Sequence, residues 1–125
     1  MLQHFALEED SLFPAFEAAT GSQIGPTMVM RNEHSQMRAL MQDMAQLLSS
    51  EQAGDYLGCA DTLLILMQQH NMKEENILYP MCNQHITGFA DLVAAGAAET
   101  EPGVVCYHED NFFGYTAATS FRFGE

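Results

Sequence analysis

The chain has 125 residues, enough for one domain with a core, and 47% of them are hydrophobic, which excludes an intrinsically disordered protein. The formal net charge is −13, from 17 acidic and 4 basic residues, and it argues against nucleic-acid and anionic-membrane partners, because both attract Lys and Arg. The 3 cysteines include no C-x-x-C pair, so neither a disulfide framework nor a zinc knuckle is expected. Acidic residues at positions 8–10 stand where a signal peptide would be apolar, and we predict a soluble, cytoplasmic protein.

The first two predicted helices are separated by a clear break. Apolar residues favour a helix over residues 1–19, with a kink or a restart at Pro14, because proline lacks a backbone N–H. The sequence GSQIGP, at residues 21–26, then interrupts the pattern. The second helix is predicted from Pro26 to about Leu48, and Leu48 ends its methionine- and leucine-rich stripe.

A third amphipathic helix is predicted over roughly residues 56–81. Ile77 and Leu78 fall on its apolar stripe, and Pro80 is expected either to end the helix or to kink it. Three such helices with short connections, and no convincing strand, predict an all-α bundle of antiparallel helices.

The composition of the chain changes near residue 85. We predict a helical domain over residues 1–85 and an irregular C-terminal tail over residues 86–125. The first part of that tail, residues 86–103, allows one short helix before a Gly/Pro break. The tail carries no pattern that predicts a function.

One unusual phrase occurs twice in this short chain, 66 residues apart. HFALEEDSLFP covers residues 4–14, and HNMKEENILYP covers residues 70–80. Both copies read His, three residues, Glu-Glu, two residues, Leu, an aromatic residue and Pro. On a helix, residues four apart lie on the same face. The His and the first Glu of each copy therefore point in one direction.

Helical spacing also predicts that these polar residues face the core. His70 and Glu74 fall on the apolar stripe of the third helix, and His34 falls on that of the second. Burying a carboxylate without a partner costs several kcal/mol, and four basic residues are too few to compensate. A metal ion would satisfy these groups together with His4 and Glu8, and imidazole with carboxylate suits iron, manganese or zinc. Each group alone is also typical of a hydrogen-bonded core histidine or a solvated glutamate, but the repetition favours metal binding.

Other polar residues near the motifs are predicted to have lesser roles. Glu9 and Glu75 follow the predicted ligands by 100° around the helix, so we expect them to hydrogen-bond to ligands or to be solvated. Cys82 and His85 lie beyond the second motif and are not predicted ligands. A ligand role stays open for His108, but a solvated tail histidine is favoured.

Three blocks, HFALEEDSLFP, GPTMVMRNEHSQMR and HNMKEENILYP, together resemble the hemerythrin-like, or HHE cation-binding, domains over residues 1 to about 85. The resemblance implies an up-down four-helix bundle that holds a non-haem di-iron site. It implies that Glu8 and Glu74 bridge the two irons. The implied iron ligands are His4, Glu8, His34, His70 and Glu74.

The sequence departs from the family pattern at two points. Family members usually begin with a further helix that carries another histidine ligand. Here the chain starts at Met1, three residues before His4, so we expect that helix to be truncated or missing, and no histidine precedes His4. Either a second chain or the tail completes the bundle, or the chain is a fragment; we favour a truncated member that forms a homodimer. Oxygen carriers of the family have a second histidine one turn after the position of His34, where this chain has Arg38. Arg38 is expected either beside an open coordination position or, preferably, in solvent.

The second departure makes the chain look more like relatives that sense oxygen or nitric oxide, or that repair iron centres. Our first hypothesis is a di-iron protein that binds or senses one of these gases. The alternatives are a di-iron protein that removes nitric oxide or peroxide or repairs iron centres, and a fragment with an incomplete metal site. The sequence leaves open whether the protein is an enzyme, and manganese or zinc could replace iron.

Overall fold

The structure, a computed structural model, describes the backbone of residues 1–99 and the side chains of residues 1–95, and it contains four helical segments and no strand over that range. The predicted all-α bundle is therefore confirmed. None of these helices is both long and apolar enough to cross a membrane. Along the chain the elements are α1 (Leu2–Leu7), η1 (Glu8–Leu12), α2 (Phe13–Thr20), α3 (Pro26–Ser49), α4 (Ala53–Lys73), η2 (Glu74–Leu78), α5 (Tyr79–His85) and α6 (Phe89–Glu99).

The first copy of the repeated phrase contains a turn of π-helix, η1, inside an otherwise continuous helix. The Phe13 N–H donates to the carbonyl of Glu8, five residues back. Pro14 follows at once, and it has no N–H to donate and clashes with the carbonyl four residues before it in an α-helix. A wider turn relieves this conflict, and such turns are frequent at functional sites. The helix therefore passes Pro14 and continues to Thr20.

The second copy repeats this geometry in η2. The Tyr79 N–H donates to the carbonyl of Glu74, and Pro80 again follows the π-turn. Of the two alternatives at Pro80, the end of the helix is wrong, because the helix continues to the end of α5. The π-turn also holds one residue more than an α-turn, which moves Ile77 off the core face. Ile77 is 53% exposed, contrary to prediction, while Leu78 is buried.

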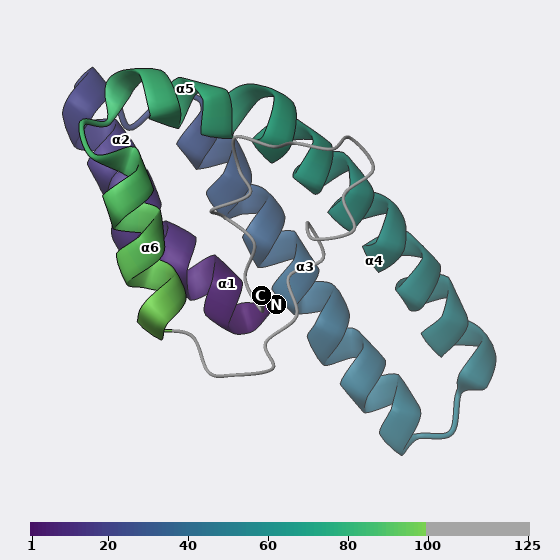
Figure 1. Ribbon diagram of the computed structural model, residues 1–125. Coiled ribbons are helices and arrows are strands. Elements are labelled where there is room, and N and C mark those ends of the chain that lie inside the picture. Colours follow the sequence, from purple (N-terminus) through teal and green to yellow (C-terminus); the bar gives the residue numbers. More distant parts are fainter. Residues whose placement is uncertain (100–125) are drawn as a thin grey trace.

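The connection between α2 and α3 shows why the first break is sharp. Gly21 ends α2 in the left-handed conformation, with φ of 70°, which glycine adopts without steric cost. Pro26 then begins α3 at the position where its missing N–H would be unpaired anyway. At the other end of α3, Leu48 is 68% exposed rather than in the core. It lies in the last turn, where the α3–α4 hairpin extends beyond the other helices (Figure 1).

Long-range packing joins the three motif-bearing segments and adds α6. Helices α3 and α4 lie side by side along an antiparallel hairpin, whereas α6 packs on η1 and α5 (Figure 1). The main hydrophobic core consists of Leu12, Phe13, Phe16, Met30, Leu78, Tyr79, Cys82, Phe89 and Val93. Two of these residues belong to α6, which lies beyond the predicted domain boundary at residue 85; that boundary stays a prediction. The rest of the predicted tail, residues 100–125, lies outside the described residues.

Candidate metal centre

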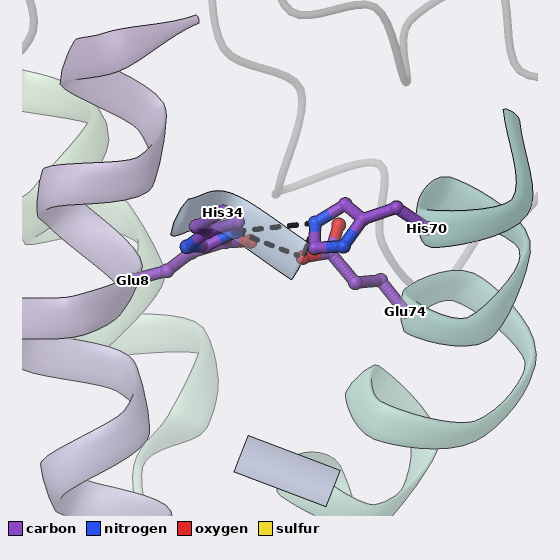
Figure 2. Close-up of side chains that lie close together, drawn as sticks. All are labelled: Glu8, His34, His70 and Glu74. Carbon is purple, nitrogen blue, oxygen red and sulfur yellow. Dashed lines mark hydrogen bonds and ion pairs between the residues drawn. The ribbon is translucent and has the colours of Figure 1, made fainter. Parts of the chain in front are cut away.

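The five predicted ligands meet inside the bundle, although they come from three separate segments of the chain. Glu8 reaches in from η1, His34 from α3, and His70 and Glu74 from α4 and η2, with His34 between the others (Figure 2). His4 joins them from α1. All five side chains are buried. The two π-turns begin at the two glutamates, so the backbone irregularity lies directly at the site.

Four of these residues form a tight group. One nitrogen or oxygen from each of Glu8, His34, His70 and Glu74 lies within 4.8 Å of the others. His34 Nε2 is 3.1 Å from His70 Nε2 and 3.2 Å from Glu8 Oε2. His70 Nε2 is 2.7 Å from Glu74 Oε1, which is also 3.9 Å from His34 Nε2. Four donor atoms thus surround one point.

His4 lies at the edge of this group. Its Nε2 is 3.1 Å from Glu8 Oε1, the oxygen of Glu8 that does not face His34. The Glu8 carboxylate therefore lies between His4 on one side and His34 on the other. Each oxygen of the Glu8 carboxylate thus has its own neighbouring histidine.

The outer nitrogen of each central histidine faces a further carboxylate. His34 Nδ1 lies 2.8 Å from Glu9 Oε1, and His70 Nδ1 lies 2.9 Å from Glu33 Oε2. An ionised carboxylate only accepts hydrogen bonds, so each Nδ1 carries the hydrogen. In the neutral rings, both Nε2 atoms then present lone pairs to each other. A proton shared between the two Nε2 atoms, which the raised pKa of His70 favours when no metal is bound, or a metal ion removes that repulsion.

The chemistry of the donor set agrees with this geometry. Two imidazole nitrogens and two carboxylate oxygens suit iron, manganese or zinc. Glu8 Oε2 is buried and accepts no hydrogen bond from residues 1–95, although His34 is close. The basic side chains of the described chain do not neutralise the cluster, because Arg31, Arg38 and Lys73 pair with Glu17, Glu9 and Glu33.

The sequence comparisons agree with this interpretation of the site. The family model for the hemerythrin HHE cation-binding domain matches residues 1–82, which is more than half of the chain. The chain belongs to this family. A search among curated proteins found no match, and neither did a search among solved structures. The protein is therefore an HHE cation-binding domain, with a buried His/Glu group that could hold a metal ion.

A tyrosine in the HHE domain was not predicted to belong to the site. The Tyr79 hydroxyl lies 2.6 Å from Glu8 Oε1 and 2.9 Å from Glu74 Oε2, and it can donate to either oxygen. Tyr79 is itself buried in the core. The only signal in the sequence was the difference between the two motifs, because the matching residue of the first copy is Phe13.

Glu33 was also missed, while Glu9 was predicted correctly to hydrogen-bond to a site histidine. Glu33 comes directly before His34 but binds His70, which is 37 residues away, and no helical spacing rule connects that pair. The solvated alternative for Glu75 is wrong, because its side chain is buried.

The two outer carboxylates are each held by a cation. Arg38 donates to both oxygens of Glu9 at 2.9 Å, and Lys73 pairs with Glu33. The bidentate pair fixes the orientation of the Glu9 carboxylate, since the planar guanidinium matches it. The preferred expectation, that Arg38 simply reaches solvent, is therefore wrong. The positive charge of Arg38 does not act unopposed on the ligands, because the Glu9 carboxylate neutralises it.

Charge interactions inside the cluster shift two pKa values in opposite directions. Burial and the Glu74 carboxylate raise the pKa of Glu8, but His4 and His34 outweigh them, and the pKa of Glu8 is lowered overall. Burial lowers the pKa of His70, but the carboxylates around it, Glu74 first, outweigh burial and raise that pKa. Without metal, the cluster thus favours internal ion pairs. A metal ion would replace them, because histidine and carboxylate ligands bind in deprotonated form.

Aromatic rings fix the orientation of His34. The Phe5 ring stacks on the His34 ring, with centroids 4.0 Å apart and planes inclined by 14°. Phe13 stacks at 5.7 Å and 21°. The imidazole is thus packed by two phenylalanines of the first motif as well as hydrogen-bonded by Glu9. Cys82 and His85 are not in the ligand group that the described residues form; His108 lies outside them.

Proposed function

We propose that this HHE domain is a non-haem iron protein that binds or senses oxygen or nitric oxide. The observation that supports the proposal best is the convergence of two buried glutamates and two buried histidines on one point, with a third histidine beside them. In the metal-free cluster the two Nε2 atoms, 3.1 Å apart, can share a proton, so this contact alone does not require a metal ion. The grouping of two carboxylates with two imidazoles is what favours a metal ion over core hydrogen bonding alone.

The proposed ligands are His4, Glu8, His34, His70 and Glu74, with the glutamates as bridges between two irons. Bound iron would supply the coordination position at which a diatomic gas binds. The chain contributes the ligands, their orientation and the exclusion of water. Glu9 and Glu33 hold the two central rings with Nε2 directed inward, a role that outer carboxylates commonly play at metal sites. Phe5 and Phe13 cover the His34 ring and keep bulk water away from it.

Four further statements belong to this proposal. The protein acts in the cytoplasm, and a second copy of the chain completes the bundle beside the site. Manganese or zinc could occupy the same donors, since both accept imidazole and carboxylate ligands. The partner of the metal is a small gas rather than a nucleic acid or a membrane, which agrees with the strongly acidic composition.

Iron content per chain tests the proposal. The protein should be purified from cells without chelator, and the iron per chain and the absorption spectra with oxygen and nitric oxide should be measured. We expect bound iron and gas-dependent spectra in the wild type, and loss of both in Glu74→Ala. Asp43→Ala is the control, because Asp43 lies exposed on α3.

The same variants distinguish a metal site from a relic. If the cluster no longer binds metal, the wild type should contain none, and Glu74→Ala should leave the metal content at zero. That result would refute the proposal. Rapid turnover of nitric oxide or peroxide by the iron-loaded wild type would replace gas sensing with a detoxifying role.

A further inference from the structure

The donor atoms of the cluster divide into two unequal halves. The inner half consists of Glu8 Oε2, His34 Nε2, His70 Nε2 and Glu74 Oε1. His34 Nε2 lies 3.1–3.9 Å from the other three atoms, and His70 Nε2 lies 2.7 Å from Glu74 Oε1. The outer half consists of the other oxygens of the two glutamates and His4 Nε2, which is 3.1 Å from Glu8 Oε1. The inner half therefore has two histidines, and the outer half has one among the described residues.

The Tyr79 hydroxyl lies on the outer half. It is 2.6 Å from Glu8 Oε1 and 2.9 Å from Glu74 Oε2, the two oxygens that an ion beside His4 would need. A phenol has one hydrogen, so the two oxygens share one donor. Both of these oxygens belong to the outer half.

We propose that the inner half binds one metal ion tightly and that the Tyr79 hydroxyl opposes the binding of a second ion in the outer half. The inference rests on the proposed function, because it assumes that the cluster binds metal. A second ion must displace the phenolic hydrogen bonds from both carboxylates, and hydrogen bonds to charged acceptors are stronger than neutral ones. The first ion replaces the ion pairs between the central histidines and the glutamates but displaces no hydrogen bond from the Tyr79 hydroxyl. Tyr79 is thus a positioning residue that makes metal loading stepwise.

The position of Tyr79 in the fold explains why its hydroxyl cannot simply turn away. The ring is buried in the core, directly after the π-turn η2 and before Pro80. Side chains in close-packed cores have little room to change rotamer. An ion entering the outer half would therefore meet the hydroxyl in place.

Stepwise zinc binding tests the proposal. The metal-free full chain should be titrated with Zn²⁺ by calorimetry and by competition with a chelator of known affinity. We expect one tight ion and a second, much weaker one in the wild type. In Tyr79→Phe, the affinity for the second ion should rise about ten- to hundredfold, the range given by the loss of one hydrogen bond to a charged group. The affinity for the first ion should stay within about threefold.

Two control variants locate the effect. Tyr56→Phe removes a hydroxyl from the first turn of α4, 14 residues and therefore about 21 Å of helix from His70, and should change neither affinity. His4→Ala should leave the first ion bound and remove the second, in the wild type and in the Tyr79→Phe background alike. The absorption of Co²⁺ bound at one equivalent should be the same in all these variants, because the inner half is intact in each.

Several outcomes would overturn the inference. Two equally tight ions in the wild type, or an unchanged second affinity in Tyr79→Phe, would mean that the hydroxyl opposes nothing. A weaker second ion in Tyr79→Phe would make Tyr79 a metal ligand instead. A second ion that survives His4→Ala would lie elsewhere. If the wild type binds no ion at all, the proposed function fails as well, whereas the other four results refute the stepwise model alone.

Discussion

The two copies of the repeated phrase have the same backbone but different surroundings. In both, the His and the first Glu enter the cluster, a π-turn begins at that Glu, and the Leu is buried two residues before Pro. The aromatic residue before Pro differs, because Phe13 stacks near the His34 ring while Tyr79 hydrogen-bonds to the cluster carboxylates. The repeated residues thus form the ligand framework. The aromatic residue that differs between the copies determines whether the motif packs near a histidine ring or hydrogen-bonds to the cluster carboxylates.

The outer carboxylates show a second difference between the copies. The first copy gives its own second glutamate, Glu9, to His34 on α3. The second copy instead receives a carboxylate, because its His70 is held by Glu33 from α3. Helix α3 therefore takes a hydrogen-bond acceptor from one motif and supplies one to the other, which couples both motifs through a single helix.

Alanine substitution of the shared leucine measures whether both copies are packed equally well. Leu12 and Leu78 occupy the same place in the two motifs, and both are buried in the main core. Leu12→Ala and Leu78→Ala should each lower the free energy of unfolding by about 2–5 kcal/mol, the usual range for a buried leucine. The two losses should be similar. Urea denaturation of the metal-free variants provides the measurement.

A control separates packing from helix propensity in that experiment. Leu57 lies exposed on α4, so Leu57→Ala should change the free energy of unfolding by less than about 0.5 kcal/mol. If only one of the two buried leucines were costly, the motifs would not share a core environment. The structural equivalence of the copies would then be limited to the backbone.

The all-α fold was predictable because it depends on local patterns. Apolar spacing locates the helices. Gly21 marks the end of α2, and Pro26 marks the beginning of α3. The convergence of the five site residues was predictable because the motif is repeated and each copy places His and Glu one turn apart. The repeat also places Glu8 and Glu74 on faces that must be buried together.

Other features depend on contacts that no local pattern records. The pairing of Glu33 with His70 joins different helices, and the Tyr79 hydroxyl reaches Glu8 across 71 residues of chain. The exposure of Ile77 was mispredicted for a different reason, because helical periodicity assumes 3.6 residues per turn and the π-turn breaks that rule. The sequence did contain one sign of the π-turn, which is a proline directly after an aromatic residue that proves to be buried.

Neutralising the outer carboxylates should change the free energy of metal binding. The change should be smaller than the loss in free energy of unfolding expected for a packed leucine. Glu9→Gln and Glu33→Gln keep the side-chain size but remove the charge that orients and polarises the histidine. Loss of such partners typically costs 10- to 100-fold in metal affinity. Glu33→Gln should cost more, because the Glu33 side chain is 9% exposed and that of Glu9 is 20% exposed. Chelator competition with Zn²⁺ measures both.

Glu17→Gln is the matched control for these two variants. Glu17 also forms an ion pair, with Arg31, but it contacts neither central histidine in the described structure. Its substitution should leave metal affinity unchanged. If all three variants kept the metal affinity of the wild type, the outer carboxylates would only fill space and would not act on the ligands.

The smallest expected effect concerns the residue two positions after each proline, which is Phe16 in the first copy and Cys82 in the second. Both are buried in the same core. Burial, together with the charges of Glu8 and Glu74, raises the pKa of the Cys82 thiol to about 12. The second copy therefore has the small, apolar Cys82 where the first copy has the aromatic Phe16. The Cys82 thiol should be unreactive.

The pH dependence of thiol modification tests this view of Cys82. The reactive species is the thiolate, so a thiol with a pKa of about 12 should react about tenfold faster for each pH unit and show no plateau between pH 7 and pH 10. The experiment uses the metal-free Cys59→Ser, Cys106→Ser variant, in which Cys82 is the remaining cysteine. A plateau below pH 9 would show that the thiol is neither desolvated nor close to the two carboxylates. In that case the second motif would open more readily than the first, and the two copies would differ in stability as well as in chemistry.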